Sequence, residues 1–160
     1  PDLKLIISLR DPYERTISHY YHNIRQGRES RDLLEAISSP ESQISSKNLD
    51  LLSSDYIKSL RFSYISKSRY AEQLDYLLEI FNTEDMLFVP YSKVININTN
   101  LRSEIFNFLG LEDFKIENMS HKNEGIQKDY FYDNEVFEFL NTCLLNDKND
   151  FLQKMNWSSF

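Results

Sequence analysis

The chain has 160 residues and a globular composition, with 41% hydrophobic and 14% aromatic residues. Its 25 acidic and 18 basic side chains give a formal net charge of −7. This balance argues against a nucleic-acid-binding surface and requires that any anionic ligand be held locally. The length suits one hydrophobic core, so we expect a single domain over residues 1–160.

Cysteine and hydropathy patterns exclude several further classes. Cys143 is the only cysteine and has no His or Cys at metal-ligand spacing, so we expect no disulfide, no zinc site, and a small buried apolar role for this side chain. No apolar run approaches the roughly 18 residues of a membrane span, and the first residues lack the pattern of a signal segment. We therefore expect a soluble chain and, because a lone cysteine is compatible with it, a cytoplasmic location.

The first predicted element is a strand at Leu3–Leu9. This run is nearly all apolar with a β-branched centre, which is typical of a strand buried on both faces of a parallel sheet. Asp11 and Pro12 then have the pattern of an N-cap and a first helical residue, with Glu14 three residues after the cap. We expect a helix to begin here and to end near Gly27.

The spacing of apolar residues predicts the remaining elements, weakly between residues 28 and 68 and more strongly in the second half of the chain. Between residues 28 and 68 we expect a short helix at Asp32–Ile37, a serine-rich loop at Ser38–Ser46, and a further helix within residues 49–62. The second half predicts a helix at Tyr70–Phe81, a buried strand at Met86–Val89, a helix at Leu101–Leu109 closed by Gly110, and a helix at Asn134–Leu145. This order indicates an α/β fold in which the two strands are parallel neighbours with helices against the sheet.

Two side chains near the first strand could hold an anion. In an open parallel sheet, ligands bind beyond the carboxyl ends of the strands, near helix N-termini. Arg10 follows the strand there and offers a donor fork for phosphate oxygens, and Ser18 lies two turns into the next helix. Taken alone, however, an arginine and a serine at such places are more often structural.

A family resemblance favours the functional interpretation. One segment resembles the part of a sulfotransferase that binds the 3′-phosphate of the donor 3′-phosphoadenosine 5′-phosphosulfate (PAPS). This segment is a strand followed by the pattern Arg-Asp-Pro-x-x-Arg-x-x-Ser-x-Tyr. Three further segments match the family's pattern in the same order, namely Ser68–Leu74, Met86–Val89 and Phe108–Leu111. The matching residues of the first segment are Arg10, Asp11, Pro12, Arg15, Ser18 and Tyr20.

The resemblance implies roles for individual residues. Arg10 and Ser18 would contact the 3′-phosphate, whereas Arg15 and Tyr20 would be structural. Tyr70 would lie near the donor nucleotide, although its helical spacing with core leucines fits packing equally well.

Further positions match the family less closely. The segment from Ser120 to Gly125 resembles a nucleotide-covering loop in which Lys122 and Asn123 are candidate phosphate contacts, with a solvated loop as the alternative. Ser92 stands where the family often has an acidic residue. His19 and His22 flank the phosphate-binding helix and invite a general-base role, but we expect structural or exposed histidines.

The family's Lys- and Gly-containing 5′-phosphosulfate loop has no match here, since Gly27, Gly110 and Gly125 are isolated from one another. The resemblance therefore implies a P-loop-NTPase-like parallel sheet flanked by helices, incomplete at the N-terminus, in a single partial domain. We expect the catalytic base to lie in the unmatched part, the present chain alone to be inactive, and no metal to be required.

In the complete protein, the resemblance implies transfer of a sulfuryl group from PAPS to a hydroxyl or amine. The acceptor could be a carbohydrate, a small molecule or a protein, and no nucleic-acid partner is expected. Two alternatives stay open: a non-catalytic nucleotide-binding or protein-interaction module of the same fold, and a relative of the P-loop nucleotide kinases.

Overall fold

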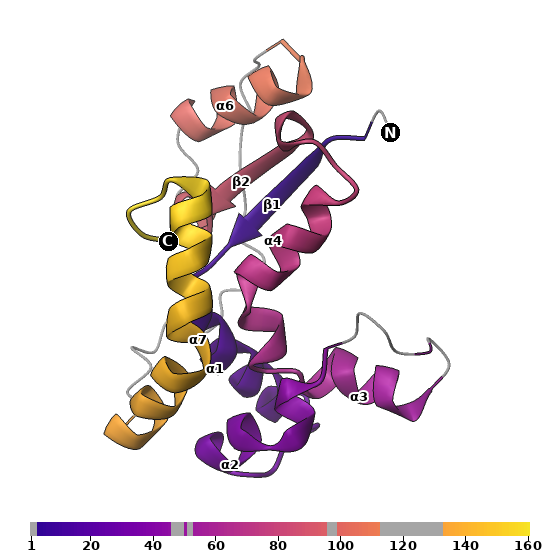
Figure 1. The fold of residues 1–160 in the computed structure, drawn as a ribbon, viewed down its shortest axis with the longest axis vertical. Coiled ribbons are helices and arrows are strands. Elements are labelled where there is room, and N and C mark those ends of the chain that lie inside the picture. Colours follow the sequence, from indigo (N-terminus) through magenta and orange to yellow (C-terminus); the bar gives the residue numbers. More distant parts are fainter. Residues whose placement is uncertain (1–2, 46–49, 51–52, 96–98, 113–132) are drawn as a thin grey trace. The chain divides into compact units, whose positions relative to one another are not determined.

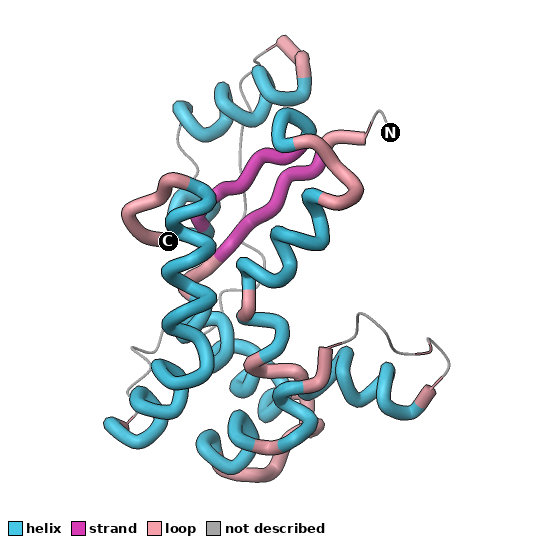
Figure 2. Tube along the Cα trace, viewed as in Figure 1, coloured by secondary structure: helices cyan, strands magenta, loops and turns pink. Residues whose placement is uncertain are grey.

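The computed structural model describes residues 3–45, 50, 53–95, 99–112 and 133–160, which form a mixed α/β structure (Figures 1 and 2). The chain divides into two compact units. The first contains Pro1–Arg10, Asp75–Asp129 and Phe160, and the second contains Asp11–Leu74 and Tyr130–Ser159. Because these stretches alternate along the chain, the units are interleaved in sequence. The expectation of one domain stays a prediction.

The first unit holds a parallel pair of strands, as predicted. β1 (Leu5–Leu9) pairs with β2 (Met86–Pro90) in a register that runs from Leu5 opposite Met86 to Leu9 opposite Pro90 (Figure 1). The expectation that the first strand is buried on both faces is wrong for the described structure. Side chains alternate along β1, and Ile6 is 43% exposed, so packing covers one face of this strand more than the other.

The described part of the first unit also contains helices. The 3-10 turn η3 (Thr83–Asp85) leads into β2, and α5 (Tyr91–Ile95) follows β2 directly and packs on both strands. α6 (Thr99–Leu109) ends where predicted, because Gly110 adopts a φ of 70° that other residues rarely take. Lys4, just before β1, donates a hydrogen bond to the carbonyl oxygen of Phe108 in the last turn of α6.

The second unit is helical. Its elements are α1 (Pro12–Arg25), α2 (Leu33–Ser38), the 3-10 turn η1 (Pro40–Gln43), α3 (Ser54–Phe62), the 3-10 turn η2 (Ser66–Ser68), the start of α4 (Tyr70–Leu78) and α7 (Asn134–Met155). α1, α2 and α7 pack on one another. Their shared core includes the fully buried side chains of Ile17, Ile37, Tyr64, Leu140 and Leu144.

Several predicted boundaries differ from the structure. The stretch Ser38–Ser46 is not all loop, because Pro40 opens η1 and the buried Ser42 accepts the Ile65 N–H. α4 ends at Leu78 rather than at Phe81, and single turns carry the chain onward. α7 continues ten residues beyond the predicted Leu145, to Met155.

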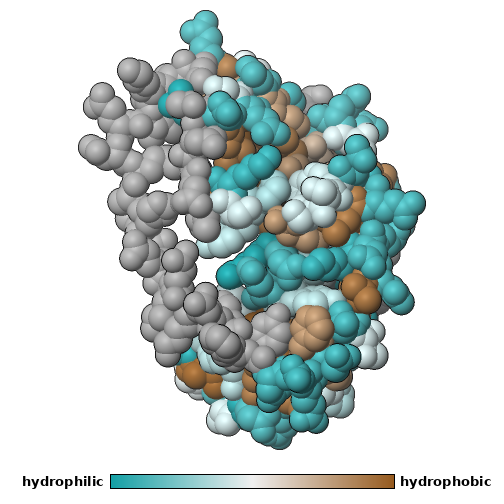
Figure 3. All heavy atoms as spheres, turned by 90° about the vertical axis from the view of Figure 1, so that its left-hand side faces the viewer, coloured by the Kyte–Doolittle hydropathy of each residue, from teal (hydrophilic) through white to brown (hydrophobic). Residues whose placement is uncertain are grey.

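Figure 3 shows one face of the molecule coloured by hydropathy. On the face shown in Figure 3, hydrophilic residues predominate and smaller hydrophobic areas interrupt them. Among the helices of the described residues, none combines the length and the apolar character needed to cross a membrane.

Candidate functional site

Arg10 follows β1 directly and lies in the first unit. Since β1 and β2 are parallel, their carboxyl ends share one edge of the sheet, and Tyr91 is the first residue after β2. The guanidinium carbon of Arg10 lies 5.5 Å from the centre of the Tyr91 ring. This distance is that of a cation–π contact, which orients the guanidinium at the edge where open parallel sheets bind ligands.

The helix that follows begins in the second unit with the predicted cap. The Asp11 carboxylate accepts hydrogen bonds from the backbone N–H groups of Tyr13 (2.9 Å) and Glu14 (3.3 Å), and Pro12 is the first helical residue. The second carboxylate oxygen of Asp11 pairs with the Lys148 ammonium of α7 at 2.5 Å. Asp11 therefore fixes the start of α1 and links it to α7.

Ser18 lies on α1, two turns beyond this cap, and is half-buried. It shares one face of the helix with Arg15, three residues earlier, and His22, four residues later. Its hydroxyl has no hydrogen-bond partner among the residues that the structure describes. This geometry leaves the hydroxyl able to donate to a ligand.

The middle of α1 is attached to the segment at residues 64–68. One Arg15 nitrogen lies 3.1 Å from the Tyr64 carbonyl oxygen and 3.4 Å from the Ser68 hydroxyl. The hydroxyls of Thr16 and Ser68 are 2.7 Å apart and both are fully buried. Burial lowers the pKa of Arg15. These contacts give Arg15 the structural role that the resemblance implies.

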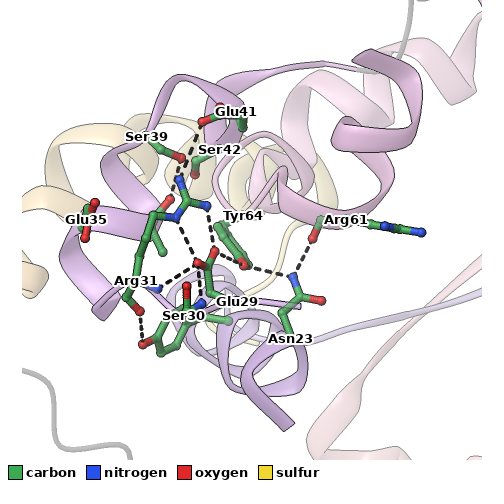
Figure 4. Close-up of polar contacts among 12 residues, drawn as sticks. Asn23, Glu29, Ser30, Arg31, Glu35, Ser39, Glu41, Ser42, Arg61 and Tyr64 are labelled. Atoms are coloured by element: carbon green, nitrogen blue, oxygen red, sulfur yellow. Dashed lines mark hydrogen bonds and ion pairs between the residues drawn. The ribbon is translucent and has the colours of Figure 1, made fainter. Parts of the chain in front are cut away.

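The C-terminal end of α1 is attached by a buried polar network (Figure 4). The Asn23 amide donates to the Tyr64 hydroxyl (2.9 Å), and this hydroxyl donates to the Glu29 carboxylate (2.9 Å). Glu29 forms two hydrogen bonds with the Arg31 guanidinium, at 2.7 and 2.9 Å. The Tyr20 hydroxyl donates to the Arg31 carbonyl oxygen (2.9 Å).

The pKa shifts of Glu29 and Tyr64 indicate a structural role for this network. The hydrogen bonds from Arg31 hold the pKa of Glu29 down at about 2, despite burial. Burial raises the pKa of Tyr64. Glu29 is thus a fixed anion and Tyr64 a fixed donor at neutral pH, and neither is suited to exchange a proton with a ligand. With its start, middle and end attached, α1 is a rigid support for Ser18.

The two histidines of α1 differ. His22 is exposed. His19 is partly buried, its ring lies edge-on 4.8 Å from that of Tyr64, and its Nδ1 is buried with no hydrogen-bond partner in the described chain. Burial, assisted by the charges of Arg15 and Lys67, lowers the pKa of His19 to about 3. A base this weak does not suit general-base catalysis near neutral pH.

Tyr70, the first residue of α4, is only 7% exposed and packs edge-on against Phe151 of α7 at 5.8 Å. This packing accounts for the tyrosine, and its proximity to a nucleotide stays a prediction. Next to it, the Asp147 carboxylate of α7 accepts the backbone N–H groups of Ala71 and Glu72, both at 3.2 Å. Burial raises the pKa of Asp147.

The other predicted positions contribute less. Lys122 and Asn123 lie outside the described residues. Ser92 is exposed on α5. Cys143 is half-buried, and burial raises the pKa of its thiol, as expected for a small packing residue. Within the described ranges, no three His, Cys, Asp or Glu side chains are grouped closely enough to hold a metal ion.

Sequence reasoning missed three contributors to these sites. Tyr91 could have been found, because an aromatic residue lies two positions after Val89, the predicted end of the second strand. Asp147 and Lys148 gave no signal, since their partners lie 76 and 137 residues away. Of the predicted phosphate contacts, Arg10 lies in the first unit and Ser18 in the second, and each is described within its own unit.

No family model and no curated protein matches the chain. Among solved structures, it is similar to a sulfotransferase from Alicyclobacillus acidocaldarius, with 21% sequence identity and a TM-score of 0.72. The match covers 99% of this chain and 56% of that protein. The fold is therefore sulfotransferase-like: a parallel strand pair flanked by helices. The chain spans little more than half the length of the protein it matches.

Proposed function

We propose that the chain binds the 3′-phosphoadenosine part of PAPS in a protein that transfers a sulfuryl group to an acceptor hydroxyl or amine. The observation that carries the proposal is the order of elements: a parallel strand, then Arg10 at its carboxyl end, then a capped helix that presents Ser18. The sulfotransferase-like fold over nearly the whole chain supports it.

The chemistry proposed for the complete protein is an in-line displacement at sulfur. The bond from sulfur to the bridging phosphate oxygen breaks, and its electron pair stays on the phosphate. The acceptor oxygen or nitrogen forms the new bond to sulfur, and the acceptor proton passes to a base. Arg10 and Ser18 would act at a distance from these atoms, by positioning the donor through its 3′-phosphate.

The first prediction concerns the preference for a 3′-phosphate. The wild-type protein should bind adenosine 3′,5′-bisphosphate more tightly than adenosine 5′-monophosphate. Because hydrogen bonds to charged groups contribute about 1.5 to 3 kcal/mol, Arg10→Ala should weaken bisphosphate binding by roughly 10- to 100-fold. Ser18→Ala should cost less. Titration calorimetry with both nucleotides, at two salt concentrations and on the protein at its full natural length, measures these effects.

Monophosphate binding provides the internal control, because this nucleotide lacks the phosphate that is held. Neither substitution should change it much, and the bisphosphate preference should shrink as salt screens the contact. Equal affinity for the two nucleotides, or an Arg10→Ala variant that retains the preference, contradicts the proposal. A transfer assay with labelled PAPS then separates an enzyme from a module that only binds the nucleotide.

A further inference from the structure

Lys148 forms an ion pair with the carboxylate of Asp11, the residue that caps the start of α1. Its ammonium lies 2.5 Å from Asp11 Oδ2 and 4.8 Å from the centre of the Tyr13 ring. Both partners are partly buried, with 24% of the Lys148 side chain and 26% of the Asp11 side chain exposed. The pair joins α7 to the start of α1 within the second unit, across 137 residues of sequence.

Asp11 is needed as a cap but carries an unfavourable charge for an anion site. Its Oδ1 atom accepts the N–H groups that open α1. Its charge lies at the N-terminal end of the helix whose next turns carry Ser18, and it is adjacent in sequence to Arg10. A carboxylate there repels a phosphate, and the formal charge of −7 on the whole chain adds to the repulsion.

We propose that Lys148 is a positioning residue for the 3′-phosphate site: by pairing with Asp11, it neutralises the one carboxylate that the helix cap requires. The inference rests on the proposed function. Ser18 is seven positions after Asp11, which places the two residues roughly 10 Å apart along the helix axis, about one Debye length at moderate salt. One unit charge at this range still acts on a dianionic phosphate.

The test first removes the positive charge of Lys148 and then, in a double variant, also removes the negative charge of Asp11. Lys148→Met keeps much of the apolar stem and should weaken bisphosphate binding about threefold to tenfold, the size expected for one charge acting on a dianion across roughly 10 Å of partly screened solvent. Monophosphate binding should change less than about twofold. Lys148→Arg should retain the wild-type preference, because it retains the charge. Calorimetry with both nucleotides gives the ratio.

A double variant separates charge from structure. Asn caps helices about as well as Asp, so Asp11→Asn removes the charge while keeping the cap. In Asp11→Asn/Lys148→Met, the bisphosphate preference should return to that of the wild type. If Lys148 served only to attach α7, the double variant would bind as weakly as Lys148→Met.

Lys154→Met is the matched control, since Lys154 pairs with Asp150 on α7 itself, at 3.0 Å. It removes one positive charge from the same helix and should leave the nucleotide preference unchanged. A Lys148→Met variant that keeps the preference overturns this inference alone. A wild-type protein that binds both nucleotides equally overturns the proposed function and, with it, the role given to Lys148.

Discussion

The guanidinium of Arg10 lies against the Tyr91 ring, and this contact joins the residues that follow the two strands. Tyr91 is 39% exposed, so the ring has room for a neighbour beside the arginine. A flat aromatic surface limits the orientations of a guanidinium without consuming its hydrogen-bond donors. The ring therefore restricts the orientation of the Arg10 guanidinium at the end of the sheet where the proposed phosphate site lies.

Substitutions at Tyr91 test this orientation. Tyr91→Leu should reduce the bisphosphate preference about twofold to fivefold, because an exposed cation–π contact contributes roughly 0.5 to 1 kcal/mol. Tyr91→Phe should preserve the preference, since it keeps the ring. The same calorimetric titration measures both variants. Equal losses in the two variants would assign the effect to the tyrosine hydroxyl instead.

Within the second unit, α7 contacts the starts of two other helices. Its consecutive residues Asp147 and Lys148 bond to the beginning of α4 and to the cap of α1. One helical turn separates Leu144 from Lys148, and a further turn brings Phe151 into the core. A single helix therefore anchors two others at their N-terminal ends, where the backbone N–H groups have no acceptor within their own helix.

The Asp147 contact can be measured separately. Asp147→Ala removes the acceptor for the Ala71 and Glu72 N–H groups and should lower the free energy of unfolding by about 0.5 to 2 kcal/mol, the usual cost of a lost cap. Hydrogen exchange at these two amides should accelerate.

Asp150→Ala is the control for this change, because Asp150 is half exposed and pairs within α7. It should change stability by less than about 1 kcal/mol. Urea titrations give both free energies. A loss in Asp150→Ala as large as that in Asp147→Ala would mean that α7 itself, rather than the cap, had been weakened.

The stability of the whole molecule should depend on pH, because two buried titratable groups, His19 and Glu29, have lowered pKa values. His19 has a pKa of about 3 instead of 6.5, so only the unfolded chain takes up this proton between these values. Stability should therefore fall as the pH drops from about 6.5 towards 3. Glu29, at about 2 instead of 4.5, adds a second loss as the pH falls below about 4.5.

The effects of His19 and Glu29 on stability can be measured separately, because they fall in different pH ranges. Between pH 6.5 and about 5, where carboxylates titrate little, the free energy of unfolding should decline in the wild type and much less in His19→Phe. His22→Gln, an exposed position on the same helix, should keep the wild-type slope. Urea unfolding at several pH values measures the slopes, and a wild-type curve that is flat in this window would contradict the burial of a neutral His19.

Local patterns in the sequence predicted much of the fold. The parallel strands, the Asp11 cap and the glycine that ends α6 each depend on a few neighbouring residues, and the structure contains them. The length of α7 could not be predicted this way. Residues 146–150 are Asn-Asp-Lys-Asn-Asp, which favour helices weakly, and burial of Leu144 and Phe151 on one side of the helix outweighs this preference.

Some residues of the candidate site could likewise be predicted from the sequence, and others could not. Arg10 and Ser18 belong to a short contiguous motif and could be proposed from it, and their joint role stays a prediction. The residues that support them could not be proposed, because pairs such as Asp11 with Lys148 join distant parts of the chain. Sequence spacing carries no information on such contacts.

The position of α7 in the chain also affects how the second unit can fold during synthesis. The apolar side of α1 packs against Val136, Leu140 and Leu144, which follow it by more than 100 residues. A ribosome therefore releases α1 and α2 long before the helix that completes their core, and the apolar surface that α7 covers has no partner from α7 throughout this interval. Contacts of such high sequence separation slow folding and leave apolar surface accessible to chaperones.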